Sequence, residues 1–599
     1  MTTPKERTPP PAPGRLSAAD VATAVLLVAA VLFLAGAGAG VFPATVWTVA
    51  GVCSLVYLVR TLRSPPPPDA AAPAPAPGGD HVLAAALVFL LLTILPLPHA
   101  VSPLTGPRRN AENARVADAL EYLAARGEPA PAPARFSLSR NRGGTGRIVL
   151  LLAAALPVFM LARRLPAAAR KPMLRVMTAA GGVLAVAGYI SQYHVPQGDT
   201  LWWWIEIPHG LPGPVAGFVN RNHYAGFLAL LCPAALACGL DDLGRRRFAH
   251  AALSAALFAV MSAALVLSLS RGALLAYAAG LLVLPLLFLS RRRLIAAAGL
   301  VAVLAVVASA ILNLPHDGLQ QRIDSMTTPA DSESLAKRLD ATRTCLRIWR
   351  AYPVSGAGAN AFRFTFPVHR TTSTRAYRVH AENEYAQLLA ETGAIGLVLL
   401  SAGAFALGWR FVAAARRRFA PAAWIAALGA LAAAGVHATV EFTLHAPVYT
   451  VGLALLTGLA LPCDETSSRR SAAWPAAVCA AAVLILLPIL IPLRQYDDPH
   501  HVFDAELPEL ARILPWTPVA AHAWYRLGTE CRRRGDPALQ PLAAAALAHA
   551  GACDPNNYVL WLRIGKQRLR LKDYRGAREA FKRVKALRHW VTTPEVPDA

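Results

Sequence analysis

Charged residues are scarce in this chain of 599 residues: Asp, Glu, Lys and Arg make up 16% of it, whereas 55% is hydrophobic. A string of ordinary soluble domains is excluded, because the apolar residues come in long unbroken runs. A bilayer core about 30 Å thick needs roughly 20 apolar residues in a helix, and the runs have this length. The sequence therefore predicts an all-α polytopic membrane bundle of about 12–14 transmembrane helices.

Acidic residues are the rarer charges, 35 against 59 Lys and Arg, which leaves a formal net charge of +24. The basic excess does not indicate nucleic-acid binding, because the Arg clusters fall between hydrophobic runs instead of forming one stripe. Such clusters are expected on the cytoplasmic side of a membrane protein. These clusters are 163–171, 245–247, 291–293, 416–418 and 469–470.

The predicted spans alternate so that all of these clusters lie on one side. This alternation puts the N-terminus inside and the C-terminus outside the cytoplasmic membrane. The predicted spans are 18–40, 43–59, 82–101, 148–162, 173–190, 222–240, 249–269, 272–289, 294–314, 385–409, 421–440, 446–461 and 472–493.

Cysteine is sparse, and the eight residues form no metal-ligand spacing. Cys531 and Cys553 could pair, but two separated thiols favour the unpaired state. No Walker loop and no paired-aspartate or His/Cys metal motif is visible, so a nucleotide sugar held through a metal is not expected. We expect no metal and no cofactor.

The predicted domains are a disordered start over 1–17, a membrane domain over 18–493 and an outer domain over 494–599. The membrane domain carries outer loops at about 102–147, 191–221 and 315–384. The first loop is Pro-rich and basic and is expected to be irregular. In the second loop three consecutive tryptophans, Trp202 to Trp204, predict an interfacial anchor, with a sugar- or lipid-facing role as the alternative.

The outer domain contains two similar units, 523–557 and 560–590. Trp524 and Trp561 are each followed, three and four positions on, by Leu or Ile and then Gly. This pattern resembles tetratricopeptide repeats, although a generic pair of helical hairpins is the alternative. Two units are too few for a free-standing solenoid, so a capping helix or the membrane domain must support them. Either interpretation implies an exported module for protein interaction or for positioning, and in the first case we expect an envelope protein as the partner.

Ionisable residues beside a span are expensive, so they are functional candidates by default. Four clusters stand out, and the alternation places all of them at the outer face. They are Asn220, Arg221, Asn222 and His223; Arg271; Arg338 with the arginines that follow it; and His380, Glu382, Asn383, Glu384 and Glu391.

Several arginines beside a histidine indicate a site for a doubly charged phosphate group and a proton acceptor. Guanidinium holds phosphate oxygens in a bidentate manner, and imidazole can remove a proton from a hydroxyl near neutral pH. Taken alone, Arg271 could be a helix-end residue that reaches the headgroups. His380 alone could be a structural, hydrogen-bonded histidine. The convergence of the clusters at one face favours a site.

Together these motifs resemble the O-antigen ligase and polymerase superfamily of bacterial envelope glycosyltransferases. The matching stretches are "FVNRNHYAGFLAL", "SLSRGALLAY", "RLDATRTCLRIWRAYPVSGAGANAF" and "HAENEYAQLLAETGAIGL", with "GVHATVEFTLHAPVYTVGLALLTGLAL" as a fifth, weaker match. The resemblance implies a GT-C-like membrane fold in the cytoplasmic membrane and a glycan donor on undecaprenyl diphosphate. It implies inverting, metal-independent transfer of that glycan to a hydroxyl of a glycan, lipid or protein acceptor.

The resemblance also implies roles for individual residues. Arg271 and Arg338 would hold the diphosphate, with Arg221 beside them, and His380 would act as or beside the general base. Many relatives carry a histidine where this chain has Glu382, so the base could be His380, Glu382 or the two as a coupled pair.

The polar residues that flank these groups are expected to support them: Asn220, Asn222, Asn383 and Glu384. A structural role at the outer end of their span is expected for His437, Glu441 and His445, with a place in the same cleft as the alternative.

Two other functions remain open from the sequence. A transporter for an anionic solute or lipid-linked glycan would need Arg-lined cavities and broken helices at the bilayer midplane. A membrane-tethered scaffold would depend on the outer repeats alone. Neither the sugar, the acceptor, nor the choice between ligation, polymerisation and protein O-glycosylation follows from the sequence.

Overall fold

The computed structural model describes most of the chain. The described residues are 16–36, 43–63, 79–131, 135–193, 200–201, 205–206, 215–287, 330–372, 378–416, 420–463, 469–486, 499–589 and 591–596. The predicted span at 294–314, the disordered start and the tryptophans at 202–204 lie outside these ranges.

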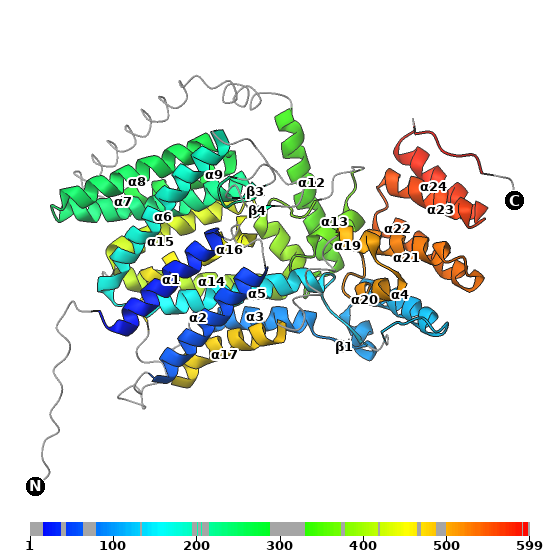
Figure 1. The fold of residues 1–599 in the computed structure, drawn as a ribbon, viewed down its shortest axis with the longest axis horizontal. Coiled ribbons are helices and arrows are strands. Elements are labelled where there is room, and N and C mark those ends of the chain that lie inside the picture. The colour runs from blue at the N-terminus through cyan, green and yellow to red at the C-terminus, as the bar shows by residue number, and fades with distance from the viewer. Residues whose placement is uncertain are drawn as a thin grey trace, which may run out of the picture.

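A bundle of apolar helices forms the larger part of the molecule (Figure 1). Seven helices among the described residues are long and apolar enough to cross a membrane. The predicted all-α polytopic class is therefore confirmed. The helices that coincide with predicted spans are α1 (Ala18–Gly36), α2 (Pro43–Arg63), α3 (Gly79–Ile94), α5 (Arg142–Arg163), α6 (Ala167–Tyr193), α7 (Arg221–Gly244), α8 (Phe248–Leu267), α9 (Arg271–Leu287), α14 (Glu384–Arg416), α15 (Pro421–His437), α16 (Pro447–Ala460) and α17 (Arg469–Leu486).

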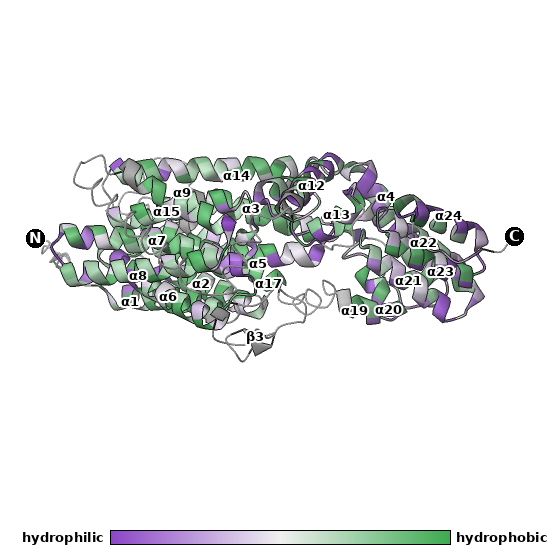
Figure 2. Ribbon diagram, turned by 90° about the horizontal axis from the view of Figure 1, so that it is seen from above, coloured by the Kyte–Doolittle hydropathy of each residue, from purple (hydrophilic) through white to green (hydrophobic). Residues whose placement is uncertain are grey.

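A second, more hydrophilic layer lies at one end of the bundle, as Figure 2 shows for α12, α4 and α24. Two short antiparallel pairs join β1 (Leu97–Pro98) to β2 (Arg135–Phe136) and β3 (Thr200–Leu201) to β4 (Ile205–Glu206). The helices outside the bundle are η2 (His99–Thr105), α4 (Pro107–Ala124), α12 (Ala330–Ala351), α13 (Phe362–His369), η3 (Thr443–His445), α19 (Pro499–Asp504), α20 (Leu507–Ile513), α21 (Ala521–Arg533), η5 (Pro537–Leu539), α22 (Gln540–Cys553), α23 (Tyr558–Arg570) and α24 (Tyr574–Leu587).

Small residues let the central helices α7, α9 and α15 approach closely. A Cβ at Gly280 of α9 would meet the carbonyl of Gly429 of α15 at 2.9 Å, and one at Gly429 would meet Pro233 of α7 at 2.6 Å. Close backbone contact of this kind is how membrane helices associate when lipid is as apolar as their side chains. It fixes the starts of α7 and α9 beside the end of α15.

The end of the bundle away from the hydrophilic layer carries buried ion pairs. Arg163 donates to Asp80 at 2.5 Å, and Lys171 and Arg175 pair with Asp242 at 2.5 and 2.7 Å. Arg163 and Lys171 belong to the 163–171 cluster that the sequence assigns to the cytoplasm, and Arg175 follows that cluster closely. Which side of the membrane this end faces remains a prediction.

The first outer loop is not irregular, so that expectation is wrong. Residues 107–124 form α4, which begins with Pro107 at its first position after Gly106. Val116, Leu120 and Leu123 are buried on one side of α4 in a core that includes residues of α20 to α24. Val116, Leu120 and Leu123 are four and three residues apart, which places them in one apolar stripe along α4. The surface that this stripe packs against, α20 to α24, is distant in sequence.

The C-terminal unit consists of two helix pairs, α21 with α22 and α23 with α24. In each pair the tryptophan indole donates to a carbonyl six residues earlier, Trp524 to Pro518 and Trp561 to Pro555, both at 2.9 Å. The two units thus share a local structure, while their identity as tetratricopeptide repeats stays a prediction. Both support elements expected from the sequence are present, because α20 packs on α21 and the core extends to α4. Cys531 and Cys553 are unpaired, as expected.

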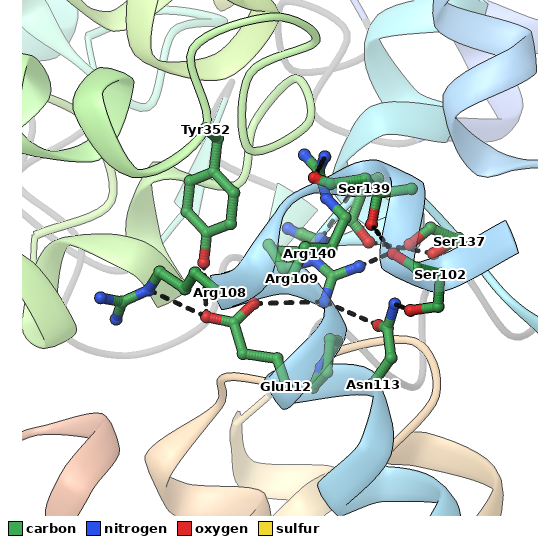
Figure 3. Close-up of polar contacts among 12 residues, drawn as sticks. Ser102, Arg108, Arg109, Glu112, Asn113, Ser137, Ser139, Arg140 and Tyr352 are labelled. Carbon is green, nitrogen blue, oxygen red and sulfur yellow. Dashed lines mark hydrogen bonds and ion pairs between the residues drawn. The ribbon is translucent and has the colours of Figure 1, made fainter. Parts of the chain in front are cut away.

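A buried polar junction joins α4, the β2–α5 connection and the end of α12 (Figure 3). Glu112 accepts hydrogen bonds from Tyr352 at 2.6 Å, from Arg108 at 3.1 Å and from Arg140 at 3.3 Å. Arg140 is fully buried and also donates to Asn113 at 3.0 Å. Because a buried charge needs a partner, this junction fixes the hydrophilic layer in one orientation relative to the bundle.

The same junction holds the turn that follows α12. Arg109 donates to the carbonyl of Gly356. The Asn141 amide donates to the carbonyl of Asn360 at 2.8 Å, and the Thr145 hydroxyl donates to that of Ala359 at 2.7 Å. The turn over 353–361 is therefore anchored by the first outer loop on one side, and its other side faces α14.

Candidate functional site

The start of α9 carries Arg271 at an exposed position beside the end of α15. The preceding Leu269 has φ of 53°, in the left-handed region that is costly for a branched side chain. A methyl group at Gly272 would stand 3.0 Å from a methyl of Val440 and 3.4 Å from the ring of His437. This contact places the Arg271 backbone next to the connection between α15 and α16.

The start of α7 meets the same connection. Asn220 caps the helix by accepting from the backbone N–H of Asn222 at 2.8 Å. Asn222 donates to the Glu441 carboxylate at 2.5 Å, and the buried ring of His223 lies edge-on to Phe442 with centroids 4.7 Å apart. Arg221, between them, is exposed.

Helix α12 contributes Arg338 from the third outer loop. Its Nε donates to the Glu382 carboxylate at 2.7 Å, and the two side chains are 35% and 34% exposed. Glu382 has φ of 55°, again in the left-handed region. Unfavourable backbone of this kind is held only where surrounding structure determines it, and it clusters at functional sites.

His380 lies against the connection between α15 and α16. Its ring stacks on Phe442 with centroids 4.3 Å apart and lies 4.4 Å from the ring of His445. Its Nδ1 is 3.2 Å from the amide nitrogen of Gln387. Burial and the positive charge that His445 and His223 can carry hold the pKa of His380 well below its ordinary value.

His445 forms a pair with Glu384, the first residue of α14. Nδ1 of His445 lies 3.1 Å from one carboxylate oxygen and 3.2 Å from the other. The backbone N–H of Leu444 also donates to this carboxylate at 2.9 Å. Burial alone would lower the pKa of His445, but the adjacent Glu384 carboxylate raises it above its ordinary value.

Glu391 connects this region to the anchored turn. Its carboxylate accepts from the backbone N–H of Asn360 at 2.7 Å, from that of Phe362 at 3.0 Å and from the Gln387 amide at 3.0 Å. The turn needs Gly356, because a Cβ there would meet the backbone of Glu391 at 2.2 Å. The turn and the first helical turns of α14 therefore form one hydrogen-bonded unit.

These contacts bring segments from four parts of the chain to one end of the bundle. Glu441 is buried, and its pKa is raised to about 7 by that burial and by the nearby Glu382 carboxylate. Glu441 accepts from Asn222 at the start of α7 and is close enough to the Arg338–Glu382 pair to feel its charge. We refer to the following residues as the polar cluster: Asn222, Arg338, His380, Glu382, Glu384, Glu441 and His445.

The sequence-predicted site residues divide into three groups. Arg338, His380, Glu382, Glu384 and Asn222 make direct contacts in the polar cluster. Arg221 and Arg271 occupy exposed helix starts next to it. Asn220 and Asn383 act as caps, Asn383 by accepting from the backbone N–H of Ala386 at 3.1 Å. Capping of a helix start is the role that the structure shows for both asparagines.

Sequence reasoning missed Gln387 and left His445 and Glu441 outside the candidate site residues. For His445 and Glu441 a structural role was favoured over a place in the same cleft, and the structure shows that both contact candidate residues directly. Gln387 was not considered, although it lies four residues after Asn383 and four before Glu391. That spacing puts the three on one helix face and could have identified it.

Among the described residues, no group of three or more His, Cys, Asp and Glu side chains is arranged to hold a metal ion. Arg221 and Arg271 are exposed beside the polar cluster, and Arg338 lies within it, paired with Glu382. Guanidinium groups suit phosphate oxygens, and the histidine–carboxylate groups beside them suit proton transfer.

Comparison with known families gives one match. Residues 256–401 match the family described as O-Antigen ligase. The matched region contains Arg271, Arg338 and His380, while the segment that carries His445 lies beyond it. No curated protein matches the chain.

The family indicates a membrane glycosyltransferase-type enzyme that in general uses a lipid-linked glycan donor and a glycan acceptor. The several apolar helices agree with a multi-pass membrane protein. Over residues 256–401 the chain is therefore similar to the O-antigen ligase family, and this similarity supports an O-antigen ligase-like membrane protein.

Proposed function

We propose that the protein transfers a glycan from undecaprenyl diphosphate to a hydroxyl acceptor at the outer face of the bacterial cytoplasmic membrane. The observation that carries the proposal is the meeting of Arg338 and Glu382 with His380 and His445 beside the exposed starts of α7 and α9. The family match supports the same chemistry in its general form.

The reaction breaks the bond between the anomeric carbon and the diphosphate oxygen. The acceptor oxygen forms a new bond to that carbon from the opposite face, which inverts its configuration. The acceptor proton passes to a base of the protein, and undecaprenyl diphosphate leaves as an anion. Arg271 and Arg338, with Arg221 nearby, would stabilise the charge that develops on the leaving oxygen, without a need for a metal ion.

The polar cluster offers the proton acceptor. His380 and Glu382 are the candidates that the resemblance implies, and Glu382 is held in place by Arg338. In this proposal the side of the bundle with the polar cluster faces away from the cytoplasm. The C-terminal helix pairs then lie outside as well, where they would contact an envelope partner.

Replacing Arg271 or Arg338 by alanine tests the proposal. Loss of one group that stabilises transition-state charge should lower transfer by about 10²–10³-fold. Membranes of a deletion strain, treated with a chelator, can supply donor and acceptor to the purified protein. The size of the product then separates the addition of one block from a ladder of repeats.

Arg343→Ala is the matched control, because Arg343 is exposed on the same helix and lies outside the polar cluster. It should transfer at the wild-type rate. Normal transfer by Arg271→Ala and Arg338→Ala at normal abundance would refute the proposal.

A further inference from the structure

The Glu382 carboxylate is engaged by Arg338 at 2.7 Å, which leaves two histidines of the polar cluster as candidates for the base, and their hydrogen bonds distinguish them. A general base must present an unprotonated nitrogen to the acceptor hydroxyl. In a neutral imidazole one ring nitrogen carries the proton, and the partner of the other nitrogen determines which one. The neighbours of His380 and His445 therefore decide which ring can accept a proton from substrate.

The orientation of Gln387 fixes the tautomer of His380. The backbone N–H of Ala381 donates to the side-chain oxygen of Gln387 at 2.9 Å. The amide nitrogen of Gln387 donates to the Glu391 carboxylate at 3.0 Å. A flipped amide would place two donors against each other at Ala381 and two acceptors against each other at Glu391.

That amide nitrogen also lies 3.2 Å from Nδ1 of His380. Since the nitrogen is a donor, Nδ1 must accept, and the proton of the neutral ring is on Nε2. His380 can donate a hydrogen bond through Nε2 to an oxygen of a bound substrate. It cannot take a proton there without first losing its bond to Gln387.

His445 has the opposite arrangement. Its Nδ1 lies within 3.2 Å of both oxygens of Glu384, and a carboxylate accepts, so Nδ1 carries the proton. Nε2 of His445 is then the unprotonated nitrogen. Within the described part of the chain Nε2 makes no hydrogen bond, and the side chain is 14% exposed, so solvent or a substrate can reach it.

We propose that His445 is the general base of the transfer reaction and that Glu384 is its positioning residue. This inference rests on the proposed function and deepens it. The acceptor proton passes to Nε2 of His445 as the acceptor oxygen bonds to the anomeric carbon. The Glu384 carboxylate stabilises the imidazolium that forms, as carboxylates do in other histidine pairs. His380 acts as a hydrogen-bond donor to the substrate.

Several ionisable groups face His445 and bear on its pH dependence. Glu384 and Glu391 lie on α14, His380 lies on the preceding loop, and His223 lies at the start of α7. The two carboxylates favour the protonated ring, and the other rings oppose it when charged. The pKa of His445 is raised on balance, so activity should rise with pH through a value above that of an ordinary histidine.

Glutamine variants test the assignment, because the glutamine amide can donate but cannot act as a base. His445→Gln should lower transfer by about 10²–10⁴-fold, the usual contribution of a general base. His380→Gln keeps a donor near Nε2 and should lose no more than about tenfold, the value of one neutral hydrogen bond. Equal losses, or a larger loss for His380→Gln, would overturn the proposal.

Glu384→Gln separates positioning from folding. Its oxygen would accept from the Leu444 N–H and its amide would donate to Nδ1, which moves the proton of His445 to Nε2. Transfer should fall by at least about 10²-fold, and the acid limb of the rate profile should move to lower pH. A lower rate with an unmoved limb would indicate a merely structural effect and contradict the assignment.

Chemical rescue by imidazole and nitrogen-15 NMR test the roles of His445 and His380 independently of the glutamine variants. Imidazole added to His445→Ala should restore transfer and should not restore His380→Ala; the reverse would refute the base assignment. Nitrogen-15 NMR of labelled histidines should find Nδ1–H on His445 and Nε2–H on His380, whatever the activity. If wild-type protein transfers no glycan, the proposed function fails. If wild-type and His445→Gln transfer equally, only the base assignment fails.

Discussion

Replacing Gly356 by alanine probes the turn that supports Glu391 and, through it, the polar cluster. Gly356 has φ of 68°, and an added Cβ would lie 2.2 Å from the carbonyl carbon and oxygen of Glu391. It would also lie 2.3 Å from the backbone nitrogen of Thr392. These are backbone atoms, so no side-chain rotation relieves the contact. Gly127 has φ of 74° with nothing within 4 Å of its Cβ position, which makes Gly127→Ala the matched control.

The two substitutions share one cost and differ in another. Placing alanine in the left-handed region costs about 1–2 kcal/mol at either position. At Gly356 the contact with α14 adds about 1–3 kcal/mol or more, the usual cost of overpacking. Gly356→Ala should therefore destabilise the protein by about 2–5 kcal/mol and Gly127→Ala by about 1–2 kcal/mol.

Thermal unfolding of the purified protein in detergent, followed by transfer measured below the transition, checks both effects. Gly356→Ala should unfold at a lower temperature than the control. It should also transfer more slowly at a temperature where both are folded, because Gln387 and His380 depend on Glu391 for position. Equal unfolding temperatures and equal rates for the two variants would refute this account of the turn.

Two other predictions concern charged groups. Asp554→Ala should remove the carboxylate that pairs with the buried Arg370 at 2.6 Å and destabilise the protein by about 3–5 kcal/mol. The C-terminal helix pairs should then be cut faster in limited proteolysis, and unchanged cleavage would contradict this. The pKa of Glu441 is raised to about 7 in the folded protein, so the folded state holds the proton more tightly than the unfolded state. The contribution of Glu441 to the free energy of unfolding is therefore full below about pH 4.5 and is lost as pH rises through 7. Between these two pH values the free energy of unfolding of the wild type should fall by up to about 3 kcal/mol relative to that of Glu441→Gln. Unfolding free energies of the two proteins that run parallel with pH would contradict this prediction.

The sequence was sufficient for what depends on local composition. Apolar runs located the bundle helices, and the starts of α7 and α9 were identified because charge beside a span is unusual. The alternation of the predicted spans placed Arg338 and the 380–384 segment at one face, although the sequence could not show that Glu382 would be the direct partner of Arg338.

What the sequence could not supply depends on distant packing. The apolar stripe of α4 has meaning only against α20 to α24, which follow it by several hundred residues. His445 resembled a structural histidine because its partner Glu384 begins another helix. The distinction between His380 and His445 rests on the orientation of one amide, that of Gln387, and no spacing pattern encodes it.

The most direct test measures the fate of the lipid carrier during glycan transfer. Purified protein in lipid nanodiscs, given undecaprenyl-diphosphate-linked glycan and acceptor, should release one undecaprenyl diphosphate for each glycan joined, with the anomeric configuration inverted. Release should require Arg271 and Arg338. Binding of the lipid-linked glycan without any release of undecaprenyl diphosphate would contradict the assignment of this chain as a glycan transferase.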